Sequence, residues 1–180
     1  MTIQVDAKGR FNEAELRRFG TRTLKVIGLE GDVAILVTSN RRMREFNRWY
    51  RQKAHATDVL SFPGNPKLDH AGDIAISADI AAHNAKKLGH SQAVEIKVLI
   101  LHGILHLAGY DHESDSGEMA GLEDHIRARL GLPNALIKRT LAGASRKKSD
   151  GWRKPAKIGR ARAAATGRKK APQGRSTSTK

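Results

Sequence analysis

Charge is distributed so unevenly along this chain of 180 residues that only part of it can fold around a core. Residues 1–133 carry 18 basic and 17 acidic side chains, a net charge of +1, whereas residues 134–180 carry 15 basic side chains and one acidic side chain, a net charge of +14. The second segment consists mostly of Ala, Gly, Lys, Arg, Ser and Thr, so it cannot bury enough apolar surface to offset the entropy lost on ordering. We therefore predict one globular domain over 1–133 and a disordered basic tail over 134–180.

Composition excludes several classes of protein. The chain has no cysteine, which excludes disulfide scaffolds, thiolate metal sites and cysteine nucleophiles. Its longest apolar runs, such as residues 98–101, are far shorter than the roughly 20 residues that a membrane-spanning helix needs. Residues 1–10 lack the apolar run of a signal peptide. We expect a cytoplasmic protein without a membrane partner.

Apolar periodicity and turn residues predict interleaved strands and helices within the domain. Strands are expected at 1–7, 33–37, 57–62 and 73–77, with residues 69–72 as a loop. Five helices are expected. The first covers 13–27 and follows the N-cap Asn12, and the second follows Asn40. The other three run from 79 to Gly89, from the N-cap Ser91 to Gly109, and over 116–130. The irregular order favours an α+β fold, a small mixed β-sheet packed with about five helices.

The predicted helix after Asn40 has two contrasting faces. Its apolar positions are Met43, Phe46, Trp49 and Tyr50, which we expect to face the core. The opposite face is basic and is either simply solvated or functional; it consists of Arg41, Arg42, Arg44, Arg48 and Arg51.

Residues 102–112, HGILHLAGYDH, hold three of the chain's eight histidines. His102 and His106 are four residues apart, so their Cβ atoms are expected about 5–6 Å apart on one helix face. Gly109 can adopt a positive φ, which lets the helix end and the chain bring His112 back toward the other two. Three neutral imidazoles around an open fourth position describe a catalytic zinc site, here at the end of a central helix. The alternative, ordinary histidines without a metal, does not account for their clustering.

The same spacing matches the zinc-protease pattern H-E-x-x-H-x-x-G-x-x-H with one departure. Position 103 is Gly, whereas in those proteases a Glu at this place takes a proton from the zinc-bound water. Gly103 has no side chain that could act as this base. The pattern therefore predicts zinc binding and disfavours peptide hydrolysis by that route.

Four motifs together carry a family resemblance. They are NRWYR at 47–51, TDVLSFP at 57–63, GDI at 72–74 and HGILHLAGYDH at 102–112. With these motifs in this order, roughly residues 30–130 resemble the bacterial YbeY family. The resemblance implies a single-domain, single-strand-specific, zinc-dependent endoribonuclease that acts in late ribosome quality control and in maturation of the 3′ end of 16S rRNA.

The resemblance also implies roles for individual residues. His102, His106 and His112 would be the ligands of one Zn²⁺ per chain, and Arg51 and His102 would be catalytic. A guanidinium fork at Arg51 could bind two phosphate oxygens as charge develops during RNA cleavage, although an exposed arginine on a basic helix is the simpler interpretation. Asp58 and Asp73 lie in the motifs and are candidate structural residues. Asp111 could orient a ligand or act as a base.

Two other functions remain open from the sequence. One is a zinc hydrolase of another substrate class, and the other is a non-catalytic, zinc-stabilised ribosome-assembly or RNA-binding factor. The expected partners are RNA, in particular rRNA within the ribosome, with ribosomal proteins or a ribosome-associated GTPase as further candidates. We expect the basic tail to bind phosphate backbones by releasing counterions, the alternatives being an anionic membrane surface or a purely solubilising extension.

Overall fold

The computed structural model describes residues 2–7, 11–110 and 117–133 of the chain. The predicted disordered tail, 134–180, lies outside these ranges, and so do His112 and Asp111.

The four strands form one mixed sheet, as predicted. They are β1 (Ile3–Asp6), β2 (Asp32–Thr38), β3 (Val59–Pro63) and β4 (His70–Ser77), in the order β1-β2-β4-β3. Strands β1, β2 and β4 are parallel to one another, whereas β3 pairs antiparallel with β4. The sheet therefore ends in two edge strands, β1 and β3.

Strand β4 begins earlier than expected, and the prediction of a loop over 69–72 was wrong for most of that segment. His70 pairs with Asp32 of β2, and Gly72 pairs with both Val33 of β2 and Pro63 of β3. The turn is confined to Asp69, whose φ is +54°. Pairing with strands on both sides therefore outweighs the turn preference of the local sequence.

Five α-helices pack with the sheet and confirm the α+β class. They are α1 (Glu13–Ile27), α2 (Asn40–Arg51), α3 (Ala78–Leu88), α4 (Gln92–Leu107) and α5 (Glu118–Leu130), with a short 3₁₀ turn at Pro66–Leu68. The predicted N-caps Asn12 and Ser91 accept the expected backbone hydrogen bonds, and Gly28 and Gly89 end their helices in the left-handed conformation. No helix in the described ranges is long and apolar enough to cross a membrane.

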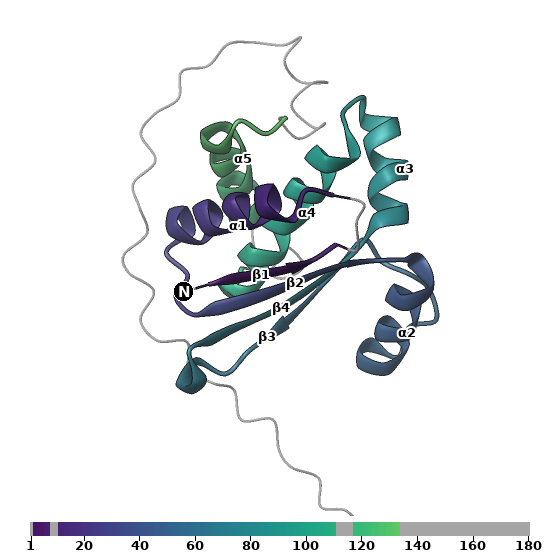
Figure 1. Ribbon diagram of the computed structural model, residues 1–180, viewed down its shortest axis with the longest axis horizontal. Helices are drawn as coiled ribbons and strands as arrows, with labels where there is room; N and C mark the ends of the chain where they lie inside the picture. Colours follow the sequence, from purple (N-terminus) through teal and green to yellow (C-terminus); the bar gives the residue numbers. More distant parts are fainter. Residues whose placement is uncertain (1, 8–10, 111–116, 134–180) are drawn as a thin grey trace, which may run out of the picture. The chain divides into compact units, whose positions relative to one another are not determined.

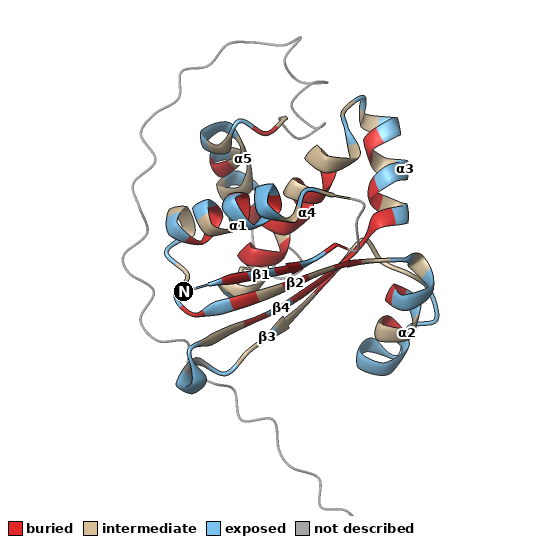
Figure 2. Cartoon of the chain, in the orientation of Figure 1, coloured by how far each residue is buried: buried red, intermediate tan, exposed pale blue. Residues whose placement is uncertain are grey.

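The helices divide unequally between the two faces of the sheet. Figure 1 shows α1, α3, α4 and α5 on one face and α2 on the other. The main core lies under the four helices and includes Ile35, Ile74 and Ile100, all at most 2% exposed (Figure 2). Under α2 there is only a small core of Met43, Leu60 and Ala75. One sheet face is therefore covered by a single short helix.

Helix α2 begins at Asn40, one residue earlier than expected. Ser39, not Asn40, is the N-cap residue, and its hydroxyl accepts a hydrogen bond from the Arg42 N–H. Asn40 is instead the first helical residue; its side-chain oxygen accepts a hydrogen bond from the Ser77 hydroxyl at 2.6 Å, and its N–H donates to Asp79. These contacts join the start of α2 to the start of α3, where β2 and β4 end side by side.

The expected apolar face of α2 is only partly buried. Met43 and Asn47 are buried, whereas Trp49 is 64% exposed and Tyr50 is 66% exposed. The prediction that both aromatic residues face the core was therefore wrong. The physical reason is that, within the described residues, no second helix packs beside α2 on its face of the sheet, so the flanks of α2 are largely open to solvent.

Candidate metal centre

His102 and His106 lie on the last turns of α4, and their imidazole rings converge. The rings meet edge to face with 4.7 Å between centroids, and the two Nε2 atoms are 3.1 Å apart. Two nitrogens about 2.05 Å from a tetrahedral metal ion lie about 3.3 Å apart. The pair thus has the spacing of two ligands of one metal ion. In the absence of a metal, a hydrogen bond from the Nε2–H of one ring to the Nε2 of the other accounts for the same distance.

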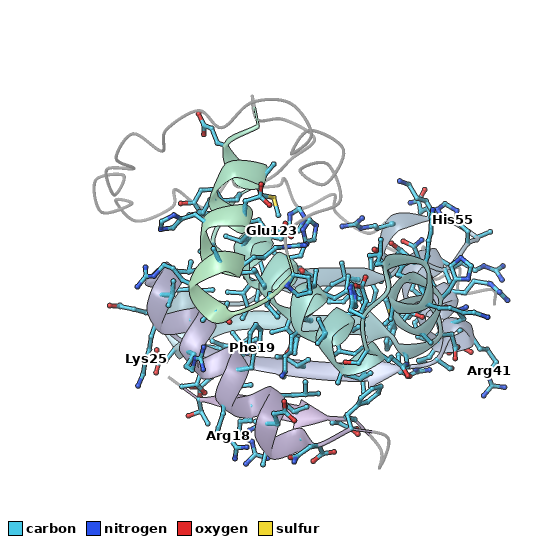
Figure 3. The ribbon with its side chains drawn as sticks, turned by 90° about the horizontal axis from the view of Figure 1, so that it is seen from above. Arg18, Phe19, Lys25, Arg41, His55 and Glu123 are labelled. Carbon is cyan, nitrogen blue, oxygen red and sulfur yellow. The ribbon has the colours of Figure 1, made fainter. Side chains whose placement is uncertain are left out.

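Glu123 on α5 fixes the orientation of the first ring. Its Oε2 lies 2.9 Å from Nδ1 of His102, and its Oε1 accepts hydrogen bonds from the guanidinium of Arg127 (Figure 3). Burial raises the pKa of Glu123, but the hydrogen bond from His102 and the charge of Arg127 outweigh burial and hold the pKa below its usual value. The ionised carboxylate accepts from Nδ1–H, which leaves the Nε2 lone pair of His102 for a metal.

Gly103 brings α4 close to the sheet beside the histidines. A Cβ at this position would lie 2.9 Å from Cγ2 of Ile74 and 3.2 Å from Oγ of Ser61, and the Ser61 hydroxyl donates to the Gly103 carbonyl at 3.2 Å. Any larger side chain there would point into the sheet. This packing gives a structural reason for glycine where the zinc-protease pattern has its catalytic glutamate.

The chain reverses directly after His106. The Gly109 N–H donates to the His106 carbonyl at 3.0 Å and the Tyr110 N–H donates to the Leu105 carbonyl at 3.1 Å, while Gly109 has a φ of +89°. These two hydrogen bonds make a Schellman motif, which requires a residue that tolerates positive φ. Gly109 therefore ends the helix and turns the chain as the sequence indicated.

The third predicted ligand, His112, lies two residues beyond Tyr110, outside the described residues. Among the residues that are described, no three His, Asp or Glu side chains are grouped to hold a metal ion. The two converging imidazoles nevertheless fit a metal by their spacing and by the carboxylate behind His102. Zinc ligation by the three histidines stays a prediction.

Comparison with known proteins identifies the family. The family model described as Endoribonuclease YbeY matches residues 5–131, a range that includes His102, His106 and Glu123. The chain belongs to the YbeY endoribonuclease family. The matched residues end inside the predicted domain 1–133, and the basic tail lies beyond them.

Relatives of the family resemble the chain over most of their own length. A protein described as endoribonuclease YbeY from Koribacter versatilis is 52% identical over 135 residues, which cover 75% of this chain and 88% of the relative. A protein of the same description from Solibacter usitatus is 47% identical over 125 residues, 69% of this chain and 83% of the relative. A solution structure of a Thermotoga maritima protein has a TM-score of 0.53 at 25% identity and covers 84% of this chain and 99% of that protein.

Arg51 lies apart from the two histidines. It is the last residue of α2 and is exposed, and Gln52 follows it in the left-handed conformation. Asn47 stabilises the segment beyond, because its side-chain amide donates to the His55 carbonyl at 2.7 Å. Arg51 therefore ends α2, whereas both histidines lie on α4, a helix that packs on the other face of the sheet.

The two described aspartates of the motifs make local contacts. Asp58 accepts hydrogen bonds from the Thr57 hydroxyl at 3.1 Å and from the Val59 N–H at 2.9 Å, at the start of β3. Asp73 is exposed on β4 with one oxygen 3.4 Å from Nε2 of His70. These contacts agree with the structural roles that the sequence analysis allowed for both residues.

Glu123 is the functional candidate that the sequence analysis missed. It lies 21 residues from His102 on a different helix, and its i,i+4 spacing from Arg127 is typical of an ordinary ion pair on a helix surface. Its burial, with a side chain 13% exposed, is what separates it from such a pair. Only the packing of α5 against α4 reveals its contact with a histidine.

Proposed function

We propose that this protein is a zinc-dependent endoribonuclease that cleaves single-stranded RNA during maturation of ribosomal RNA. The observation that carries the proposal is the convergence of the His102 and His106 imidazoles, with a partly buried carboxylate behind one of them, in a member of the YbeY endoribonuclease family. The resemblance refines the proposal to the 3′ end of 16S rRNA and to late ribosome quality control in the cytoplasm.

His102, His106 and His112 would hold the metal, and Glu123 would act through His102. When bound, zinc supplies a Lewis acid and lowers the pKa of a bound water to about 7. The chain's own contribution is orientation: Glu123 keeps the proton of His102 on Nδ1, and Gly109 ends α4 shortly before His112 in the sequence. Both features hold the ligands in place before substrate arrives.

Arg51 would bind the scissile phosphate. RNA cleavage places additional negative charge on the phosphate oxygens in the transition state, and a guanidinium can donate to two of those oxygens at once. Its exposed position at the end of α2 leaves the guanidinium accessible to a polynucleotide. The chemistry of the product ends identifies the attacking group, because a 2′,3′-cyclic phosphate forms only when the RNA 2′-hydroxyl attacks.

The decisive experiment measures cleavage of an rRNA precursor by the purified full chain. We expect cleavage that a chelator abolishes, that Arg51→Ala and His102→Ala each reduce at least tenfold, and that the exposed control His83→Ala leaves unchanged. Cleavage that persists equally in Arg51→Ala and His102→Ala would come from a contaminating nuclease and contradict the proposal. RNA binding without cleavage by the wild-type chain would instead favour a zinc-stabilised assembly factor.

The segment 134–180 is proposed to be a disordered RNA tether attached to the domain 1–133. Its net charge of +14 and its small number of large apolar residues support binding to phosphate backbones without sequence preference. Ribosomal proteins or a ribosome-associated GTPase are candidate partners of the same assembly. A tether of this kind would keep the catalytic domain near its substrate.

A further inference from the structure

Helix α2 carries an exposed row of arginines that no fold contact explains. Arg41, Arg44, Arg48 and Arg51 are spaced by three, four and three residues, so they lie on one face of the helix over about 15 Å. Like charges at these spacings repel one another and destabilise the helix. The first turn of α2 also contains no acidic residue to offset its basic side chains. Arg41 in the first turn therefore opposes the helix dipole, and the arginine row as a whole suits an anionic ligand.

Exposed aromatic side chains lie on the adjoining flank of the same helix. The guanidinium of Arg42 lies 4.8 Å from the ring centre of Phe46 and 5.7 Å from that of Trp49, and the Phe46 and Trp49 rings are 6.5 Å apart. Tyr50 packs against Phe62 of β3 with 4.8 Å between ring centres. Trp49 and Tyr50 are thus oriented by neighbours while about two thirds of each side chain stays open to solvent.

A hollow of about 530 Å³ adjoins these aromatic residues on the side of the sheet that α2 leaves open. Its lining includes the aromatic residues Phe46, Tyr50 and Phe62 and the polar residues Gln4, Asp6 and Asp73. The volume is within the range of about 300–1,000 Å³ of small-molecule pockets. Aromatic walls can stack a flat base, and carboxylate and amide oxygens can accept hydrogen bonds from its amino groups.

We propose that the outer surface of α2 and this hollow form a binding surface for single-stranded RNA, with the arginine row on the phosphates and Trp49 and Tyr50 stacked on bases. The inference rests on the proposed function and names a part of its substrate-binding site. A basic track beside exposed aromatic rings is the arrangement that binds single strands, because stacking needs unpaired bases and phosphates need cations. Arg51 ends the arginine row, so a strand bound along α2 leads to the residue proposed to hold the scissile phosphate.

The stacking step is tested by the fluorescence of Trp49. The chain has two tryptophans, so Trp152→Phe leaves Trp49 as the sole reporter in the full-length protein. The probe is a single-stranded 2′-O-methyl oligonucleotide of about 12 nucleotides, in which methylation removes the 2′-hydroxyl as a nucleophile. We expect it to quench Trp49, and an abasic strand with the same phosphates to leave the emission unchanged. Equal Trp49 emission with the oligonucleotide and with the abasic strand would overturn the stacking role. An acidic protein surface would then be the remaining candidate ligand of α2.

The phosphate step is tested by the salt dependence of binding. A plot of log K against log salt has a negative slope, to which each single-strand phosphate contact contributes about 0.7. The triple variant Arg41→Gln, Arg44→Gln and Arg48→Gln should therefore make this slope shallower by about 2. The matched control is the triple variant Arg17→Gln, Arg18→Gln and Arg22→Gln, which removes three exposed arginines from α1 on the other face of the sheet. Figure 3 shows Arg18 far from Arg41. An equal loss of slope in the two triple variants would refute a specific role for α2.

The readouts keep this inference separate from the proposed function. A wild-type chain that cleaves RNA, together with α2 variants that bind and cleave as the wild type does, would overturn the inference and leave the nuclease activity standing. A wild-type chain that binds RNA along α2 but does not cleave it would overturn the nuclease proposal and leave the binding surface standing. Far-UV circular dichroism of every variant confirms that α2 is still folded.

Discussion

Replacing Gly103 by alanine should destabilise the domain, although alanine is the better helix former. Alanine in place of glycine favours a helix interior by about 1 kcal/mol. Against this gain, the new Cβ would lie 2.9 Å from Cγ2 and 3.0 Å from Cδ1 of Ile74, a residue that is 1% exposed. Overpacking of this kind costs about 1–3 kcal/mol, and a buried β-branched side chain has little freedom to move away. We expect a net loss of about 1–2 kcal/mol in the free energy of unfolding.

Two further variants show whether the contact with Ile74 is the cause. Gly121 lies within α5 with no atom inside 4 Å of its ideal Cβ, so Gly121→Ala should gain about 0.5–1 kcal/mol. Ile74→Ala alone should cost about 2–5 kcal/mol, because it leaves a cavity in the main core. Adding Gly103→Ala to Ile74→Ala should then be neutral or stabilising, since the atoms that Cβ would meet on Ile74 are gone.

The assay is urea unfolding of the full chain, followed by far-UV circular dichroism. The reasoning predicts opposite signs for Gly103→Ala and Gly121→Ala, and a coupling of about 2 kcal/mol between positions 103 and 74. A Gly103→Ala protein at least as stable as Gly121→Ala would refute the packing explanation. It would also remove the structural reason for the missing glutamate beside the histidines.

Three other predictions concern the metal centre and the tail. His102→Ala, His106→Ala and His112→Ala should each lose the zinc that the wild-type chain retains in metal analysis, and equal retention in all three would contradict the ligand assignment. Glu123→Gln should lower zinc affinity about 10–100-fold in a competition titration, while the exposed Glu118→Gln on the same helix should leave it unchanged. Deletion of 134–180 should weaken RNA binding and flatten its salt dependence without altering zinc content; an unaltered slope would refute the tether.

Features set by neighbouring residues were predictable from the sequence. The caps of α1 and α4 and the left-handed glycines that end α1 and α3 follow from side-chain and backbone preferences over a few residues. The reversal after His106 was predictable for the same reason, since Gly109 supplies the positive φ that the turn needs. Apolar alternation also located the four strands within a few residues.

Features set by distant contacts were not predictable. The early start of β4 depends on pairing of His70 with β2 and of Gly72 with both β2 and β3, and periodicity cannot show which neighbours a segment acquires. The exposure of Trp49 depends on the absence of a second helix beside α2. Glu123 became a candidate only because α5 packs its carboxylate against His102, 21 residues away in the sequence.

The central claim is that the histidine site provides metal-dependent RNA cleavage, and one titration tests it directly. The metal-free full chain is titrated with zinc while bound zinc and the rate of RNA cleavage are measured on the same samples. The account predicts that cleavage rises in proportion to bound zinc, reaches its limit at one zinc per chain, and is absent at every zinc concentration in His106→Ala. Full cleavage by the metal-free chain, or cleavage by His106→Ala equal to that of the wild type, would contradict it.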